Sequence, residues 1–119
     1  MIGVEFMGVV YLTTLLRCYD GDTCTIHLDD VPPFVATQTL RFDGFDTPEI
    51  KGKCASEKTL AREARDMTLA YMRNGGKLYT NGKRGKYGRL LVKAPALQNK
   101  LIASGLARPY AGGRRLLWC

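Results

Sequence analysis

Apolar and polar residues alternate in the first quarter of the chain, as expected for strands with one buried face. Residues 9–16 (VVYLTTLL) and 23–28 (TCTIHL) are rich in apolar and β-branched side chains, and Asp20-Gly21 lies between them. Asp-Gly between two alternating segments is typical of a β-hairpin. We therefore predict a hairpin at Asp20-Gly21, and we read the N-terminal run MIGVEFMGVVYLTTLL as one strand.

A loop and a third strand are predicted next. The segment DDVPPFVAT contains Pro32 and Pro33. Because proline cannot donate a hydrogen bond inside a regular strand, this segment is predicted to be a loop. A third strand is predicted over residues 38–45, and Pro48 ends it.

A long helix is predicted in the middle of the chain. Ser56, with Glu57 in the first turn, favours its start, and Asn74-Gly75-Gly76 favours its end. Apolar residues recur between these points at helical spacing, which indicates one buried face. They are Leu60, Ala64, Met67, Ala70 and Tyr71.

The last third of the chain predicts shorter elements. Strands are expected over residues 77–80 and 90–93, on either side of the glycine-rich basic loop NGKRGKYGR. A second helix over residues 96–104 ends at Gly105. From about residue 108 an irregular tail is expected.

This order predicts an α+β fold in one domain spanning residues 1–119. A small five-stranded β-barrel of the oligonucleotide-binding (OB) type fits the order, with a helix between strands three and four and a second helix after strand five. The order alone does not choose this barrel over an open sheet.

Charge narrows the function classes. Eighteen Lys and Arg against eleven Asp and Glu give a net charge of +7, which suits a partner that is a polyanion such as a nucleic acid. No segment has the run of about eighteen apolar residues that a membrane span needs. The N-terminal run lacks a basic segment and a small-residue cleavage site. We therefore expect a cytoplasmic protein with no membrane partner.

The four cysteines argue against a structural zinc site, because the chain has no Cys-x-x-Cys pair and one histidine, His27. Cys18 and Cys24 fall in predicted strands and are expected to be buried thiols. Cys54 and Cys119 fall in loop-like sequence and could pair in an oxidising compartment.

Candidate chemistry lies first in LRFDGFDTPE, residues 40–49, which contains Arg41, Asp46 and Glu49. Carboxylates are ligands that calcium prefers, and a guanidinium can hold a phosphate. The plain alternative is that Asp46-Thr47-Pro48 only ends a strand. In a regular strand Arg41 and Asp46 would point to opposite faces, so their cooperation requires a bulge or twist, which Asp43-Gly44 could provide.

Two further stretches carry candidate residues. The loop KRGKYGR combines basic residues with Tyr87 and glycines, which suits a phosphate backbone but is also common in plain exposed turns. The stretch Asp20-Gly21-Asp22-Thr23 could place a carboxylate near a metal, although most Asp-Gly hairpins bind nothing.

Together, Asp20-Gly21-Asp22-Thr23, then Arg41 with Asp46-Thr47-Pro48-Glu49, then Lys86-Tyr87-Gly88-Arg89 resemble the staphylococcal-nuclease (thermonuclease) family in content and order. The likeness runs from about Val9 to Tyr110 and includes GLARPY. The tail GGRRLLWC together with KGKC is similar to the short bacterial, phage and plasmid members.

The resemblance implies a calcium-dependent endonuclease that hydrolyses phosphodiester bonds of DNA and RNA with little sequence specificity and leaves 3′-phosphate ends. It also implies a role for each matching residue: Asp22, Asp46 and the carbonyl of Thr47 as Ca²⁺ ligands, Glu49 as base, Arg41 and Arg89 as phosphate-binding catalytic groups, Lys86 and Tyr87 as nucleic-acid contacts, and Asp20 as support for the ligands.

A catalytically inactive member of the same fold that binds nucleic acid or protein is the alternative, and a monomer without an obligate protein partner is expected. The chain departs from the family in its short interval between Gly88 and Gly105 and in its early end. We therefore expect a trimmed last strand, with stability supplied by packing of Trp118 or by a bridge between Cys54 and Cys119.

Overall fold

The fold is taken from a computed structural model, which describes residues 2–113 and 117–119. Met1 and residues 114–116 of the predicted tail lie outside the described residues. In chain order the elements are β1 (Ile2–Phe6), β2 (Val9–Asp20), β3 (Thr23–Leu28), α1 (Pro33–Ala36), β4 (Thr37–Phe42), β5 (Phe45–Asp46), α2 (Ala55–Arg73), β6 (Leu78–Thr80), the 3-10 turn η1 (Lys86–Gly88), β7 (Leu90–Val92), α3 (Pro95–Ala103) and β8 (Arg108–Pro109).

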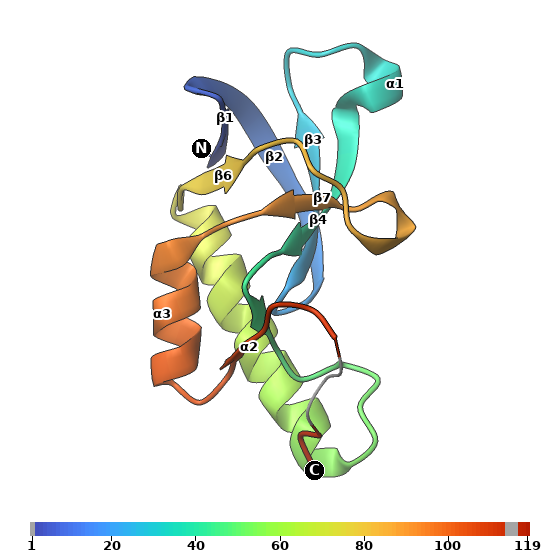
Figure 1. Cartoon of the computed structure of the whole chain (residues 1–119), viewed down its shortest axis with the longest axis vertical. Helices are drawn as coiled ribbons and strands as arrows, with labels where there is room; N and C mark the ends of the chain where they lie inside the picture. The colour runs from blue at the N-terminus through green and yellow to red at the C-terminus, as the bar shows by residue number, and fades with distance from the viewer. Residues whose placement is uncertain (1, 114–116) are drawn as a thin grey trace.

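Six strands form a nearly closed, barrel-like sheet in the order β6-β1-β2-β3-β4-β7 (Figure 1). The pairings within β1 to β4 are antiparallel, whereas β6 and β7 pair in parallel with β1 and β4. The two ends of the sheet meet where the Tyr79 N–H donates to the Lys93 carbonyl at 2.9 Å and the Lys93 N–H donates back at 2.7 Å. The chain therefore has an α+β fold built on a barrel.

The prediction of five strands was wrong by one, because the N-terminal run is a hairpin and not a single strand. Met7 and Gly8 both have positive φ angles, 50° and 83°, which reverse the chain between β1 and β2. This is the backbone of a tight two-residue hairpin turn. The strand β1 that results also pairs with β6, so it helps to close the barrel.

Three smaller predictions also need correction. The loop that contains Pro32 and Pro33 includes a short helix, α1, with Pro33 at its first position, where the missing N–H costs no helical bond. The third strand is divided at Asp43-Gly44 into β4 and β5. The tail from residue 108 begins with a short strand, β8, which pairs with β5.

The helix α2 packs against β2 and against α3, below the barrel in Figure 1. Its buried face is Ala61, Ala64, Thr68 and Met72. Leu60, Met67 and Tyr71 of the predicted stripe flank this face and are partly buried, whereas Ala70 is exposed. The predicted helix is present, and its buried face lies about one residue further along the chain than the apolar stripe indicated.

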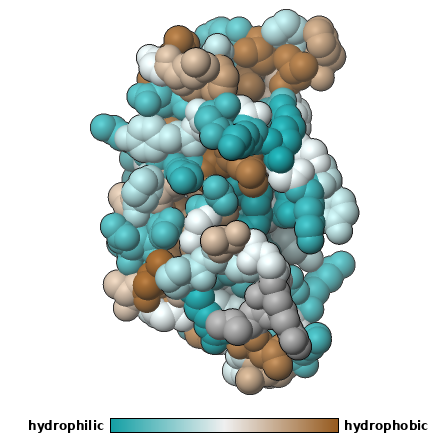
Figure 2. Space-filling model, in the orientation of Figure 1, coloured by the Kyte–Doolittle hydropathy of each residue, from teal (hydrophilic) through white to brown (hydrophobic). Residues whose placement is uncertain are grey.

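The core fills the barrel and the space between the barrel and the helices. Its largest fully buried side chains come from β3, β4, β5, α2, β6 and α3; they are Ile26, Leu40, Phe42, Phe45, Met72, Leu78, Leu97 and Leu101. No helix in the described part of the chain is long and apolar enough to cross a membrane. Hydrophobic surface gathers at the upper end of the molecule (Figure 2). The most exposed large hydrophobic side chains among the described residues include Met7 and Phe34.

All four cysteines are paired, Cys18 with Cys24 and Cys54 with Cys119. Cys18 and Cys24 are buried as predicted, but the prediction that they are thiols was wrong, because they lie directly opposite one another on β2 and β3. Side chains at opposed positions of an antiparallel pair lie close together. The pairing of Cys54 with Cys119 joins the start of α2 to the tail.

Candidate active site

The turn between β2 and β3 lies against α2. The Thr68 hydroxyl donates a hydrogen bond to the Gly21 carbonyl at 2.7 Å. A Cβ at Gly21 would lie 2.8 Å from the Ala64 Cβ and 2.9 Å from the Thr47 Cγ2, so the close packing requires glycine. The turn residues are Gly21 and Asp22, one residue further along than the predicted Asp20-Gly21, so this contact fixes the backbone next to Asp22.

The break between β4 and β5 brings Asp46 to the same place. Gly44 has a φ of +97°, a conformation that interrupts the regular alternation of the strand. As a result Arg41 and Asp46 lie on the same side, with Arg41 Nη2 3.6 Å from Asp46 Oδ1. The next residue, Thr47, is fully buried, and its N–H donates to Asp22 Oδ2 at 3.1 Å.

Arg41 is the cation at the centre of this group. Its Nη1 lies 3.3 Å from Asp22 Oδ2 and donates to the carbonyls of Phe42 at 2.6 Å and Phe45 at 3.2 Å. These contacts hold the guanidinium between the hairpin and β5. The structure therefore brings Asp22 of the β2–β3 turn together with Arg41 and Asp46 of the predicted third strand and the turn after it.

Three buried carboxylates surround this one guanidinium. Asp20, Asp22 and Asp46 are 6%, 5% and 4% exposed, and the Asp22 N–H donates to Asp20 Oδ1 at 3.2 Å. Burial, together with the neighbouring Asp22 carboxylate, raises the pKa of Asp20 from 3.8 to about 8. Buried carboxylate oxygens gathered at one cavity suit a hard divalent cation, so the residues present fit the expected Ca²⁺ site.

The basic loop also lines the site. An open cavity of about 580 Å³ is lined by Asp22, Arg41, Asp46 and Glu49 and by Lys86, Tyr87 and Arg89 of the basic loop. Tyr87 is 93% exposed and has a φ of 60°. The Arg89 guanidinium lies over its ring, with Arg89 Cζ 5.7 Å from the ring centroid. Arg89 Nε also donates to the Lys86 carbonyl at 3.2 Å. The exposed Glu49 faces the same cavity.

Several lining residues were not among the sequence candidates for the site, among them Tyr19, Asp43 and Tyr110. Tyr19 is half exposed at the end of β2, next to Asp20. Tyr110 is held by the hydrogen bond from its N–H to the Gly44 carbonyl at 2.9 Å. The GLARPY run indicated Tyr110 as part of the resemblance, and the sequence placed Asp43 beside the site without a role, but no pattern in the sequence indicated that Tyr19 would reach the cavity.

A second group of possible metal ligands lies at the start of α2. Ligand atoms of Cys54, Glu57 and Cys119 lie within 4.8 Å of one another. The two sulfur atoms are bonded to each other, so this group offers no thiolate to a metal. The Ca²⁺ site expected at the cavity with the three aspartates stays a prediction.

No protein-family model matches the sequence, and a search of curated proteins found no significant relative. The case for function therefore depends on the geometry of the cavity. Buried carboxylates, two guanidinium groups and an exposed carboxylate around one open cavity form a site that could bind a cation and a phosphate group together.

Proposed function

We propose that this protein is a calcium-dependent endonuclease of the staphylococcal-nuclease type. The observation that carries the proposal is the single cavity lined by Asp22, Asp46, Arg41, Arg89 and Glu49. This is the set that hydrolysis of a phosphodiester requires: ligands for a cation, two guanidinium groups for the phosphate and a carboxylate for the water. The six-stranded barrel is compatible with an OB-like barrel to which β1 adds a strand.

Calcium would be held by Asp22, Asp46 and the carbonyl of Thr47, and when bound it supplies positive charge to the phosphoryl oxygens. Asp20 supports this set, because its carboxylate accepts the N–H of Asp22. Arg41 and Arg89, which both line the cavity, hold the phosphate in this proposal. Both guanidinium groups are planar forks of donors that match phosphate oxygens.

Glu49 accepts a proton from the attacking water in this proposal. The water oxygen forms a bond to phosphorus, the bond from phosphorus to the 5′-oxygen breaks, and the leaving oxygen takes up a proton. The products are a 3′-phosphate and a 5′-hydroxyl. Tyr87 and Lys86 contact the neighbouring part of the strand, as exposed aromatic and basic groups do in proteins that bind single strands.

The substrate class is DNA and RNA, because the contacts proposed are to phosphate and not to base edges. The test is incubation with single-stranded DNA and with RNA in calcium and then in a chelator. We expect cleavage in calcium, loss in chelator, and a loss of at least about 100-fold in Glu49→Gln. The matched variant Glu63→Gln changes an exposed glutamate of α2 and should retain full activity.

Cleavage that survives chelation, or full activity in Glu49→Gln, would contradict the mechanism. Binding of single-stranded DNA without any cleavage would favour the alternative, a catalytically inactive member of the fold that binds nucleic acid or protein. Sedimentation of the protein in the same buffer tests the expected monomer.

A further inference from the structure

Glu57 is a buried carboxylate in the first turn of α2 and lies outside the cavity described above. It is 7% exposed, and a buried carboxylate is costly unless hydrogen bonds compensate it. Its Oε2 accepts the N–H of Glu49 at 3.2 Å, and its Oε1 accepts the N–H of Lys53 at 3.1 Å. One side chain therefore connects both ends of residues 49–53, which we call the Glu49 loop.

The Glu49 loop fits closely around this carboxylate. A Cβ at Gly52 would lie 2.5 Å from the Glu57 Cδ and 2.7 Å from its Oε1. The Gly52 N–H also donates to the Glu49 carbonyl at 2.9 Å, which closes the loop as a turn. Glycine at this position allows the backbone to approach Glu57, so the shape of the loop depends on Glu57 as well as on its own residues.

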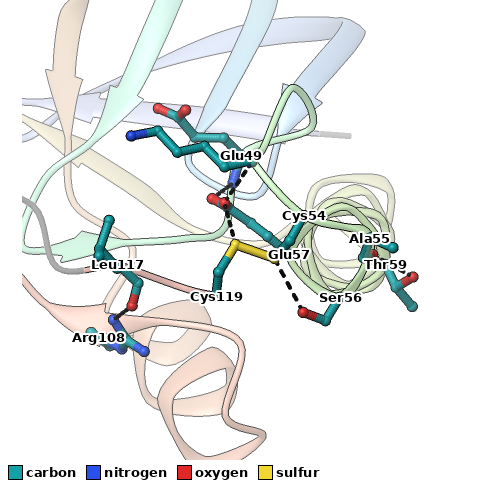
Figure 3. Close-up of a disulfide and its surroundings, with 10 residues drawn as sticks. Glu49, Cys54, Ala55, Ser56, Glu57, Thr59, Arg108, Leu117 and Cys119 are labelled. Carbon is teal, nitrogen blue, oxygen red and sulfur yellow. Dashed lines mark hydrogen bonds between the residues drawn. A yellow bond between two sulfur atoms is a disulfide. The ribbon is translucent and has the colours of Figure 1, made fainter.

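The end of the chain covers the same carboxylate (Figure 3). Cys119 forms a disulfide with Cys54, the residue that precedes α2, and its Sγ lies 3.7 Å from Glu57 Oε1. The tail is held a second time by Arg108, which donates to the Leu117 carbonyl at 2.8 Å and stacks on the Trp118 ring at 3.8 Å. The Glu49 loop, Glu57 and the tail therefore form one packed unit.

We propose that Glu57 is a positioning residue for Glu49 and that the Cys54–Cys119 disulfide places this positioning under redox control. The inference rests on the proposed function, in which Glu49 activates water. Glu57 does not line the cavity and acts through the backbone N–H of Glu49. A backbone held at one point limits where the exposed Glu49 side chain can reach.

Redox control follows from the sulfur beside Glu57. A dithiol gives two electrons and two protons to the Cys54–Cys119 bond, the bond breaks into two thiols, and the dithiol becomes a disulfide. Of the bonds described for residues 117–119, those with Arg108 then remain to hold the tail near Glu57. Water can reach Glu57 and compete for its hydrogen bonds to the loop.

The first experiment measures steady-state cleavage by Glu57→Ala and Glu57→Gln, with Glu63→Ala and Glu63→Gln as matched controls. We expect kcat to fall about tenfold in Glu57→Ala, with KM and calcium affinity within about twofold of wild type, because phosphate and metal contacts are unchanged. Glu57→Gln keeps one carbonyl oxygen as an acceptor, so its kcat should lie between those of Glu57→Ala and wild type. If Glu57→Ala does not fold, Glu57→Gln carries the test, and wild-type kcat in the folded Glu57 variants would overturn the proposal.

The second experiment follows the loop without relying on activity, since trypsin can cut after Lys51 and Lys53. Cutting there should be at least about tenfold faster in Glu57→Ala and in the double variant Cys54→Ser/Cys119→Ser. The variant Cys18→Ser/Cys24→Ser isolates the second disulfide: it should be cut slowly when oxidised and rapidly after dithiothreitol. Equal rates in all these proteins would overturn the positioning role whether or not the protein is a nuclease, whereas a wild type without nuclease activity would overturn the proposed function.

Discussion

At the scale of single residues, the unusual feature is a cluster of three buried acids. Arg41 pairs with Asp22 and Asp46, and Asp20 is buried beside Asp22. Burying carboxylates close to one another destabilises the fold, and proteins with such clusters often bind a cation there. Function and stability are therefore expected to oppose one another at these positions.

The first prediction concerns the metal ligands. Asp22→Asn and Asp46→Asn should each weaken calcium binding at least about tenfold, because a neutral amide oxygen attracts a hard cation less than a carboxylate does. Isothermal titration calorimetry measures the affinity. Asp66→Asn, which changes an exposed carboxylate on α2, should leave it unchanged. Calcium affinity at the wild-type level in both ligand variants would place the metal elsewhere.

The second prediction concerns pH. The pKa of Asp20 is raised from 3.8 to about 8, so the folded protein binds this proton more tightly than the unfolded chain does. In a chelator, the contribution of Asp20 to stability should be complete below about pH 4 and should be lost as the pH rises towards 8. The side chain in Asp20→Asn stays neutral at every pH. The difference in the free energy of unfolding between pH 5 and pH 8.5 should therefore be smaller in this variant by more than about 1 kcal/mol. Urea unfolding at pH 5 and at pH 8.5 measures it, and equal pH dependence in variant and wild type would contradict the prediction.

At the scale of elements, two kinds of contact hold the β2–β3 hairpin: one within it and one to α2. The Cys18–Cys24 disulfide joins its strands just before the turn, and the turn itself packs on α2 through Gly21. The helix therefore supports the hairpin that carries Asp22 as well as the core. This explains why the face of α2 that is buried includes Ala64 and Thr68, which are small enough to admit the turn.

The third prediction tests this packing. Gly21→Ala should destabilise the fold by about 1–3 kcal/mol, because the new methyl group would lie within contact distance of Ala64 and Thr47. Ala64→Gly should cost about 1 kcal/mol as a helix-interior glycine. The double variant should lose less than the sum of the two, since removal of the Ala64 methyl makes room. Strict additivity in chemical denaturation would show that the two residues do not compete for space.

At the scale of the whole molecule, a chain with a net charge of +7 carries a site that is itself rich in buried acids. In the proposed function the basic residues attract the polyanionic substrate and the buried acids hold the cation. The prediction that the protein is cytoplasmic stays untested. Thiol buffers of a cytoplasm keep most disulfides reduced. In that compartment the Cys54–Cys119 bridge would be broken, and Glu57 would hold the Glu49 loop less firmly.

The fourth prediction follows from this charge. Binding of single-stranded DNA by Glu49→Gln in calcium should weaken linearly on a plot of log affinity against log salt. Lys86→Ala should reduce the slope by about 0.7, the value for one phosphate contact on a single strand. Lys100→Ala, on the exposed side of α3, should leave the slope unchanged. Fluorescence anisotropy gives the affinities, and an unchanged slope in Lys86→Ala would remove Lys86 from the interface.

Much of this arrangement could be predicted from local sequence. The Asp20-Gly21 turn, the break at Asp43-Gly44 and the end of α2 at Asn74 each depend on residues that restrict the backbone locally. The hairpin at Met7-Gly8 was missed because methionine rarely adopts a positive φ.

Other features depend on tertiary contacts and could not be predicted in this way. The position of Tyr19 beside the cavity follows from how distant elements pack. The role proposed for Glu57 follows from how the loop before α2 folds back onto that helix. The cysteine pairs belong to the same class: sequence leaves the partner of each cysteine open, and the opposed positions of Cys18 and Cys24 decide it.

The Cys54–Cys119 bridge also gives the chain a covalent topology. The two cysteines are 65 residues apart, so the bond closes a ring that contains α2, the basic loop, α3 and β8. Asp22, Arg41, Asp46 and Glu49 lie on the open arm that precedes the ring, whereas Lys86, Tyr87 and Arg89 lie within it. While the bridge is intact, a single cut in the basic loop therefore leaves both sets of cavity residues in one covalent molecule. The same cut after reduction yields two fragments that no covalent bond joins.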